Sequence, residues 1–299
     1  MTDFKNEIVR FNEPKGREFF PDTFSNEIYF SHVKDFHVFK YTSNFSIKYV
    51  IKGYENYKVG GRNFTIKDRQ YLLVNDQQEV WCKQAEAKAI SIFLNKEVVC
   101  NVLDTMLYSS EQLLENPFAR EKKEINFFEN LYSNQDALGE FLTYFECVQA
   151  RQKNFNINEE LFYVLAERLL WAQIEVRKSI DQLDSVKYST RSELYRRATI
   201  ARNYIEDHIY DSFNLDILSR FSGLSKYHLL RTFKAIYHTT PYNYYLRLKV
   251  KRSEAMLRDS SLSITHIAEI SGFNDIHSYS KRFKALNGLT PTAFRKSSL

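Results

Sequence analysis

Two stretches of the chain place long hydrogen-bond donors, aromatic or apolar groups and small polar groups at helical spacing. The first supplies Lys226, Tyr227, Leu230, Arg231 and Lys234, and the second supplies Ile276, His277, Ser278, Ser280, Lys281 and Lys284. Lysine and arginine can hydrogen-bond to guanine edges or phosphate oxygens, and an apolar side chain can touch a thymine methyl group. Each set is therefore suited to contact double-stranded DNA from one face of a helix. An ordinary solvated helix face is the alternative.

The two stretches belong to one repeat. The triplet FKA at residues 233–235 returns at residues 283–285, and a Thr-Pro pair follows each copy at the same offset of fifty residues. The opposite helix faces are expected to be core: Leu229, Phe233 and Ile236 in the first copy, Tyr279 and Phe283 in the second. A repeat implies one structural unit that is used twice.

A short amphipathic helix precedes each stretch, at residues 214–221 and 263–270, and a Ser-Gly pair follows it. Glycine ends a helix readily because it adopts the left-handed conformation without a steric penalty. Polar residues stand where N-caps are expected: Asn214 and Ser263 for the first helices, Ser225 and either Asn274 or Asp275 for the second. Helix, glycine turn and helix form the helix-turn-helix pattern.

The segment between the two copies is expected to be one long helix. Pro241 fits the first helical turn, and no glycine or proline interrupts residues 242–258. Roughly 18 residues at about 1.5 Å each give a rod of about 27 Å. Such a rod can hold two units near the separation of about 34 Å between successive major-groove segments.

Charge is distributed unevenly along the chain. Residues 186–299 carry 19 lysines and arginines against nine acidic residues, a net charge of +10, whereas the rest carries 23 against 28, a net charge of −5. A basic C-terminal third behind an acidic remainder indicates an anionic partner for that third alone.

The C-terminal hundred residues resemble the DNA-binding domain of the AraC/XylS transcriptional regulators. The matching features are Ile267-Ala268, Gly272-Phe273, Arg282-Phe283-Lys284, Gly288, Thr290-Pro291 and Ala293-Phe294-Arg295. The resemblance implies that the second helix of each unit reads bases. The chain departs from the family pattern at Ser219, His238 and Leu230, and Leu230 stands where a polar base-reading residue is frequent.

Short stretches of alternating polarity predict a β-sandwich or barrel in the first part of the chain. They lie at residues 45–53, 57–64 with Gly60-Gly61 in a hairpin turn, 71–74 and 89–94. The pattern resembles the cupin-like effector domain of many family members. His32 and His37 are the only histidines before residue 120, so no metal site or other cofactor is expected. Tyr49, Tyr71 and Trp81 could line a pocket, with aromatic core as the alternative.

Residues 140–222 contain no glycine or proline and are expected to be helical. An apolar stripe, interrupted by Arg168, runs through Leu161, Val164, Leu165, Leu169 and Ala172. It is either core or part of a homodimer contact, and we expect it to contribute to a homodimer. Residues 185–191 are the expected connection into the last domain.

The expected fold is therefore α+β, in three parts. Residues 1–120 form a cupin-like sensing domain, 121–189 a helical linker or dimerisation segment, and 190–299 an all-α domain with two helix-turn-helix units joined by a long helix. No apolar run is long enough to span a membrane, and the first residues lack the apolar stretch of a signal peptide. Cys82, Cys100 and Cys147 form no paired framework, so a cytoplasmic location is expected.

These features predict a sequence-specific regulator of transcription that a small-molecule effector controls. Double-stranded DNA is the expected partner, and RNA polymerase is a candidate one. A regulator controlled by a partner protein is one alternative. A DNA-modifying enzyme is another, but Cys82 has no neighbouring histidine or second cysteine in the sequence, and the acidic residues are scattered. We therefore expect no enzymatic activity.

Overall fold

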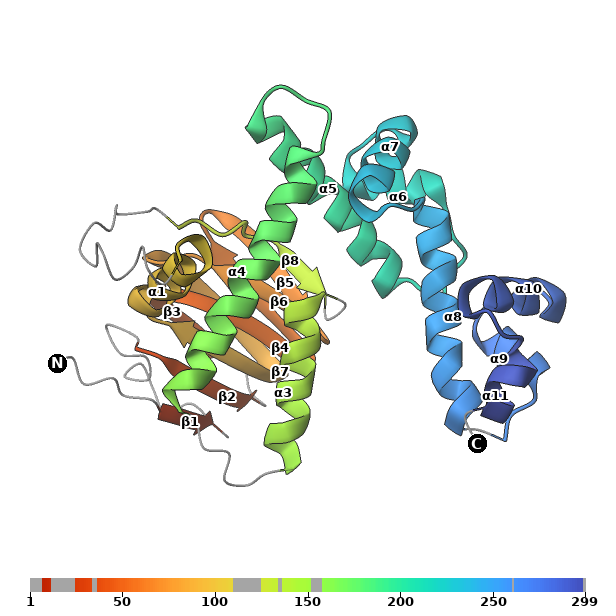
Figure 1. Ribbon diagram of the computed structural model, residues 1–299, viewed down its shortest axis with the longest axis horizontal. Helices are drawn as coiled ribbons and strands as arrows, with labels where there is room; N and C mark the ends of the chain where they lie inside the picture. Colours follow the sequence, from red (N-terminus) through yellow and green to blue (C-terminus); the bar gives the residue numbers. More distant parts are fainter. Residues whose placement is uncertain are drawn as a thin grey trace. The chain divides into compact units, whose positions relative to one another are not determined.

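The computed structural model describes residues 7–11, 25–33, 37–109, 125–133, 136–151, 158–259 and 261–297. The chain divides into two compact units, residues 1–177 and 178–299 (Figure 1). The division into three parts with separate roles stays a prediction.

An eight-stranded, mainly antiparallel sheet forms most of the first unit. Its strands are β1 (Glu7–Phe11), β2 (Glu27–Val33), β3 (His37–Ser43), β4 (Phe45–Val59), β5 (Arg62–Lys67), β6 (Gln70–Val74), β7 (Gln78–Leu94) and β8 (Leu131–Ser133). The order is β1-β2-β7-β4-β6-β8, with β3 also paired to β7 and β5 to β4. The long strands β4 and β7 therefore each join several partners, and irregular register around Lys52 marks a bulge in β4. The predicted β-rich N-terminal region is confirmed, including the hairpin at Gly60-Gly61.

Each face of the sheet has its own role, as alternate residues of β4 show. Phe45 packs on Phe127 at 4.8 Å between ring centres, and the Tyr49 hydroxyl donates to Glu146 of a covering helix at 3.2 Å. The alternate residues Ser46, Lys48 and Val50 face the other way, and Val50 joins an apolar cluster inside the unit. One face of β4 therefore holds the helices, and the other lines the interior.

Helices α3 (Ala137–Arg151) and α4 (Glu159–Asp181) cover the first of these faces, and α1 (Lys96–Leu107) follows β7 (Figure 1). Leu165 and Leu169 of α4 have no exposed surface, so they are core of this chain. The prediction that the stripe on α4 forms a homodimer contact is wrong for these two side chains. The sequence could not distinguish the two cases, because an apolar stripe has the same spacing whether it packs on a sheet of the same chain or on a second copy of the chain.

The three candidate pocket aromatics do not gather at one place. Tyr49 and Tyr71 are fully buried on the helix-facing side, where the Tyr71 hydroxyl donates to both oxygens of Asp136 at 2.9 Å. Trp81 is 40% exposed and donates to Glu79. The pocket interpretation of these residues is therefore wrong, and aromatic core is correct for the two tyrosines. His32 is exposed, and the side chain of His37 lies outside the described part.

The second unit consists of helices. They are α5 (Tyr188–Asp207), α6 (Leu215–Ser222), α7 (Lys226–Tyr237), α8 (Pro241–Asp259), α9 (Ile264–Ile270), α10 (Ile276–Asn287) and α11 (Pro291–Ser297). The connection was expected at residues 185–191. Because α5 begins at Tyr188, the connection ends at Lys187, four residues earlier than expected.

The helix boundaries follow the sequence signals. Side-chain oxygens of Asn214, Ser225 and Ser263 accept hydrogen bonds from the first turns of α6, α7 and α9. Asp275 rather than Asn274 caps α10. Gly223 and Gly272, in the turns that follow α6 and α9, have φ of +65° and +73°, as the Ser-Gly pairs predicted.

Two apolar clusters hold the second unit together. Leu229 and Phe233 of α7 belong to the first, with residues of α5, α6 and α8. Tyr279 and Phe283 of α10 belong to the second, with residues of α8 and α9. Phe273 packs against both clusters. Helix α8 and the ring of Phe273 thus contact both helix pairs, α6–α7 and α9–α10.

Candidate nucleic-acid interface

The outward face of α7 is open to solvent. Tyr227 is 70% exposed, Leu230 is 37% exposed, and the expected cations of this face are also exposed: Lys226, Arg231 and Lys234. This exposure follows from the cap at Ser225 and from the burial of Leu229 and Phe233 on the opposite side. The structure therefore places the five residues of the first set on one accessible surface.

Helix α10 presents a smaller outward face than the sequence indicated. His277, Ser278, Lys281 and Lys284 are exposed, whereas Ile276 and Ser280 are partly buried. The Ser278 hydroxyl donates to Asp275 at 2.7 Å, and hydrogen bonds from Ser278 hold the pKa of the Asp275 carboxyl below its usual value. Asp275 therefore remains a charged cap at the first turn of the helix that carries these residues.

Two acidic residues hold cations of the α7 face. Asp216, in the first turn of α6, lies 2.6 Å from the Lys226 amine. Asp184, in the connection between α4 and α5, pairs with the Arg231 guanidinium. Because Arg231 is the cation best suited to a guanine edge, its partner is a carboxylate that DNA would have to displace.

The connection that carries Asp184 is itself anchored. Arg191 of α5 donates to the carbonyl oxygens of Ser185 at 2.8 Å and Val186 at 3.3 Å, and pairs with Asp181 at 3.2 Å. Leu183, next to Asp184, is buried. The position of Asp184 beside α7 thus results from contacts within the second unit. The sequence contained no signal for this pairing, because residues 184 and 231 meet only through the packing of the connection.

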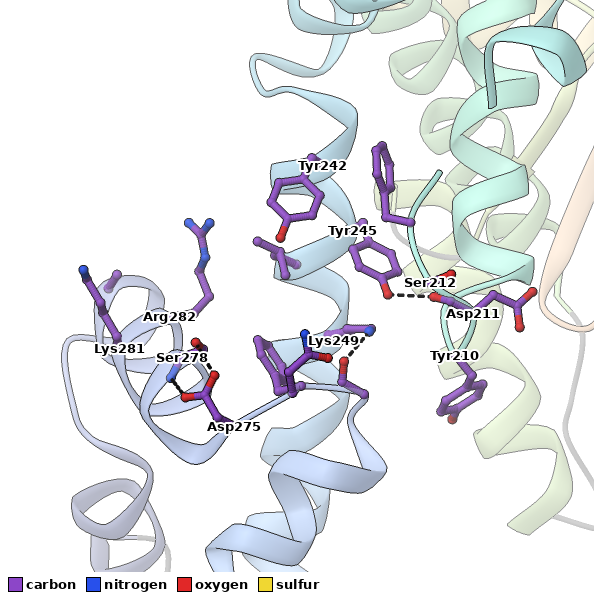
Figure 2. Close-up of a pocket in the computed structure, with 16 residues that line it drawn as sticks. Tyr210, Asp211, Ser212, Tyr242, Tyr245, Lys249, Asp275, Ser278, Lys281 and Arg282 are labelled. Atoms are coloured by element: carbon purple, nitrogen blue, oxygen red, sulfur yellow. Dashed lines mark hydrogen bonds between the residues drawn. The ribbon is translucent and has the colours of Figure 1, made fainter. Parts of the chain in front are cut away.

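A groove of about 780 Å³ separates the two helix pairs along α8. Figure 2 shows Lys281 and Arg282 of α10 on one side, Tyr242, Tyr245 and Lys249 of α8 in the middle, and residues 210–212 on the other. Lys281 therefore belongs both to the outward face of α10 and to the rim of the groove. Two residues that line the groove, Arg282 and Tyr242, were absent from the predicted contact residues. Arg282 follows the predicted contact Lys281, and Tyr242 lies at the start of the long helix, so both positions could have suggested them.

Lys249 ties α8 to the second helix pair. Its amine donates to the Gly272 carbonyl at 2.8 Å and lies 4.3 Å from the Tyr245 ring centre (Figure 2). Burial lowers the pKa of this amine. The Tyr245 hydroxyl in turn donates to the Asp211 carbonyl at 2.7 Å, which connects α8 to the loop before α6. These bonds fix the floor of the groove, so cations at its rim have a rigid support.

The described part of the chain contains no group of three or more potential metal ligands. Cys82 is a buried thiol that packs within the interior of the first unit. No helix among the described residues is both long and apolar enough to cross a membrane.

A helix-turn-helix domain family matches residues 218–297, which include α7 and α10 with their outward faces. The MmsAB operon regulatory protein of Pseudomonas aeruginosa is 31% identical over 93 residues, which are 31% of this chain and 30% of that protein. The HTH-type transcriptional activator AarP of Providencia stuartii is 28% identical over 114 residues, 38% of this chain and 84% of that protein. Residues 218–297 are an AraC-type helix-turn-helix domain.

One solved structure aligns with about the same share of this chain as these two relatives do. It is the transcriptional regulator with an AraC-type DNA-binding domain from Chromobacterium violaceum, 28% identical with a TM-score of 0.33, over 34% of this chain and 91% of that chain. The aligned region covers less than a third of the MmsAB regulator. The relatives carry the names of transcriptional regulators rather than enzymes, as the sequence predicted.

Proposed function

We propose that the protein is a sequence-specific DNA-binding regulator of transcription that reads DNA with both α7 and α10. The AraC-type domain match at residues 218–297, on two exposed basic helix faces, is the observation that carries this proposal. Both copies of the repeat contribute one helix, so a single chain supplies two DNA-reading units. The target is double-stranded DNA in the cytoplasm, with RNA polymerase as a candidate partner.

The two reading faces differ in chemistry. On α7, Arg231 can form a bidentate contact with guanine, and Leu230 can touch a thymine methyl group but cannot hydrogen-bond. On α10, Lys281 also borders the groove, where Lys281 and Arg282 would meet a phosphate of a DNA strand that runs between the two helices. The first face therefore supplies most of the base discrimination, and the second supplies more of the backbone contact.

The first unit is proposed to be a cupin-like sensing domain that binds a small-molecule effector, and the active regulator is proposed to be a homodimer. The helical segment between the units, with the connection that bears Asp184, would pass the effector signal to the α7 face. This part of the proposal is supported by the antiparallel sheet of the first unit and by the anchored connection at the start of the second.

A binding-site selection with the full chain and random duplex DNA tests the proposal. We expect a reproducible consensus in two segments, each about one helical turn from the other. The affinity of the selected duplex should fall steeply with salt concentration, because bound lysines and arginines release counterions from DNA. Enrichment of no consensus, or equal affinity for the selected and unselected duplexes, would contradict the proposal.

A further inference from the structure

The interior of the first unit holds an amine that lacks a polar partner. Lys48 of β4 is fully buried, and its Nζ makes no hydrogen bond within the described part of the chain. The amine lies 3.6 Å from the ring centre of Phe93 and 5.2 Å from that of Tyr41. Attraction to aromatic faces replaces only a part of the hydration that a buried ammonium loses. An anion beside Lys48 would supply the rest.

The side chains around Lys48 are more polar than a plain core requires. Glu55 is fully buried and accepts a hydrogen bond from the Tyr57 hydroxyl at 2.7 Å. Glu27 is also buried and accepts one from the Tyr29 hydroxyl at 2.6 Å. Buried polar groups cost free energy unless they are hydrogen-bonded, and chains seldom keep charged groups in a core that only has to be packed. This composition is typical of a ligand site.

The register of the strands shows where solvent reaches this interior. Ser91 of β7 lies opposite Lys48 on one side and opposite Tyr29 on the other. Its strand is central, and its neighbours Ile90 and Ile92, which face the other way, are fully buried. Ser91 is nevertheless partly exposed. The accessible surface of Ser91 must therefore open on the interior side, in the same row of residues as Lys48.

We propose that this interior binds a small organic acid with a single carboxylate, and that Lys48 receives the carboxylate. The rings of Phe93 and Tyr41 lie against the amine, Tyr29 packs on Phe93, and the three rings fit an apolar or aromatic body. Glu55, which acts on the amine, and Glu27, which is bonded to the Tyr29 hydroxyl, disfavour a second negative charge on the ligand. The inference rests on the proposed effector control, and it names the chemical class of the effector.

Protonation of Lys48 is linked to this binding. Burial lowers the pKa of the Lys48 amine to about 7, and the neighbouring Cys82 and Glu55 act in the opposite direction. A bound carboxylate favours the charged amine, so it raises that pKa again. At pH 8 the empty site holds mostly neutral amine, and binding of a carboxylate therefore takes up a proton from the buffer.

The test uses two pairs of probes that differ only in charge. They are 3-phenylpropanoate with 3-phenylpropanamide, and hexanoate with hexanamide, each added at millimolar concentration to the purified full chain. We expect at least one carboxylate to raise the Tm of the wild type more than its amide does, and Lys48→Met to abolish that difference. Lys40→Met is the matched control, because Lys40 also lies over an aromatic ring, that of Trp81, but pairs with Glu79 on the surface. It should respond like the wild type.

A second measurement uses the wild type alone and does not depend on the folding of a variant. Calorimetric titration with the stabilising carboxylate at pH 8, in two buffers of different ionisation enthalpy, should show net proton uptake. The inference is wrong if neither carboxylate stabilises the wild type beyond its amide, if Lys48→Met keeps the response, or if no proton is taken up.

DNA binding, measured on the same preparations, separates this inference from the proposed function. DNA binding without any stabilisation by a carboxylate would refute the inference about Lys48 but would not contradict the proposed regulator function. A carboxylate response in a protein that selects no DNA sequence would refute the proposed function and leave the acid-binding site intact.

Discussion

Arg231 and Lys281 occupy the same position in the repeat. Because their head groups differ, replacing each by alanine should affect DNA binding differently. Arg231→Ala should cost about 1–3 kcal/mol of binding free energy and relax the preference at one or two base pairs. Lys281→Ala should weaken binding evenly across sequences and reduce the salt slope by about one. Binding-site selection and salt titration with each variant measure both effects. A change of base preference in Lys281→Ala, with none in Arg231→Ala, would reverse the assignment.

Asp184 should lower DNA affinity because it holds Arg231 in the absence of DNA. Both side chains are more than half exposed, so the pair is weak, and Asp184→Asn should raise affinity only about two- to fivefold. Asp181→Asn, at the end of α4, is the charge control: it removes an equal charge from a pair with Arg191, while the bonds from Arg191 to the carbonyl oxygens of Ser185 and Val186 still hold the connection. In an Arg231→Ala background the gain from Asp184→Asn should disappear. If the gain persists there, the effect is general repulsion of phosphate and not release of Arg231.

The Lys48 amine predicts how the stability of the ligand-free protein depends on pH. Its pKa is about 7 in the folded chain and 10.5 as a free side chain, so between these values the unfolded state binds more protons. Stability should therefore rise with pH across this window, whereas below pH 7 the cost of the buried charge is fully present. Lys48→Met should be more stable than the wild type near pH 7, with a difference that shrinks towards pH 10. Thermal unfolding of both proteins across this range measures it, and a constant difference would show that the amine does not titrate there.

At the scale of the elements, two glycines with nearly the same positive φ form a matched pair. Gly272 and Gly288 have φ of +73° and +74°, so alanine strains the backbone about equally at both, by about 1–2 kcal/mol. A Cβ at Gly288 meets nothing within 4 Å, whereas a Cβ at Gly272 would lie 2.6 Å from the Lys249 amine. Gly272→Ala should therefore lower the free energy of unfolding by about 1 kcal/mol more than Gly288→Ala does, because it also displaces the hydrogen bond from Lys249 to the Gly272 carbonyl.

Chemical unfolding of the two variants measures this difference. In a Lys249→Met background the methionine has no amine to donate to the Gly272 carbonyl. The losses of unfolding free energy from Gly272→Ala and Gly288→Ala should therefore become more nearly equal. Equal losses in the original background would show that Lys249 moves aside without penalty.

Elements of the second unit were predictable because their signals are local. The caps at Asn214, Ser225 and Ser263 and the glycine turns set helix ends within a few residues of themselves, and the repeat supplied each signal twice. The choice between Asn274 and Asp275 was not predictable, since either can cap and only the path of the turn decides. Contacts such as Asp184 with Arg231 depend on residues far apart in sequence, and no local pattern encodes them.

The first unit was less predictable because its elements depend on their neighbours. Alternation in residues 45–53 correctly predicted a strand, but both faces of its first half are buried, so the pattern could not distinguish the helix-facing side from the interior. Lys48 falls inside that alternation as an ordinary polar residue. Its burial became visible only when β7 and its aromatic side chains were placed opposite.

At the scale of the whole molecule, the division into two units predicts where DNA affinity resides. A fragment of residues 178–299 should bind DNA with strong salt dependence, because it carries its own apolar clusters and the basic helix faces. A fragment of residues 1–177 should not bind. Fluorescence anisotropy with labelled duplex, at low and moderate salt, compares the two fragments with the full chain. Equal binding by the first fragment would contradict the assignment of the interface.

If α7 and α10 both contact DNA, as proposed, the length of α8 sets the distance and the angle between the two contacts. One residue inserted in it would turn the second helix pair about 100° around the axis and advance it about 1.5 Å, so α10 would face away from the DNA that α7 contacts. Seven inserted residues, about two turns, would restore the direction but add about 10 Å, the rise of about three base pairs. On the proposed function, the length of α8 limits the half-site spacings that one chain can contact, so an operator of different spacing would require an α8 of a different length.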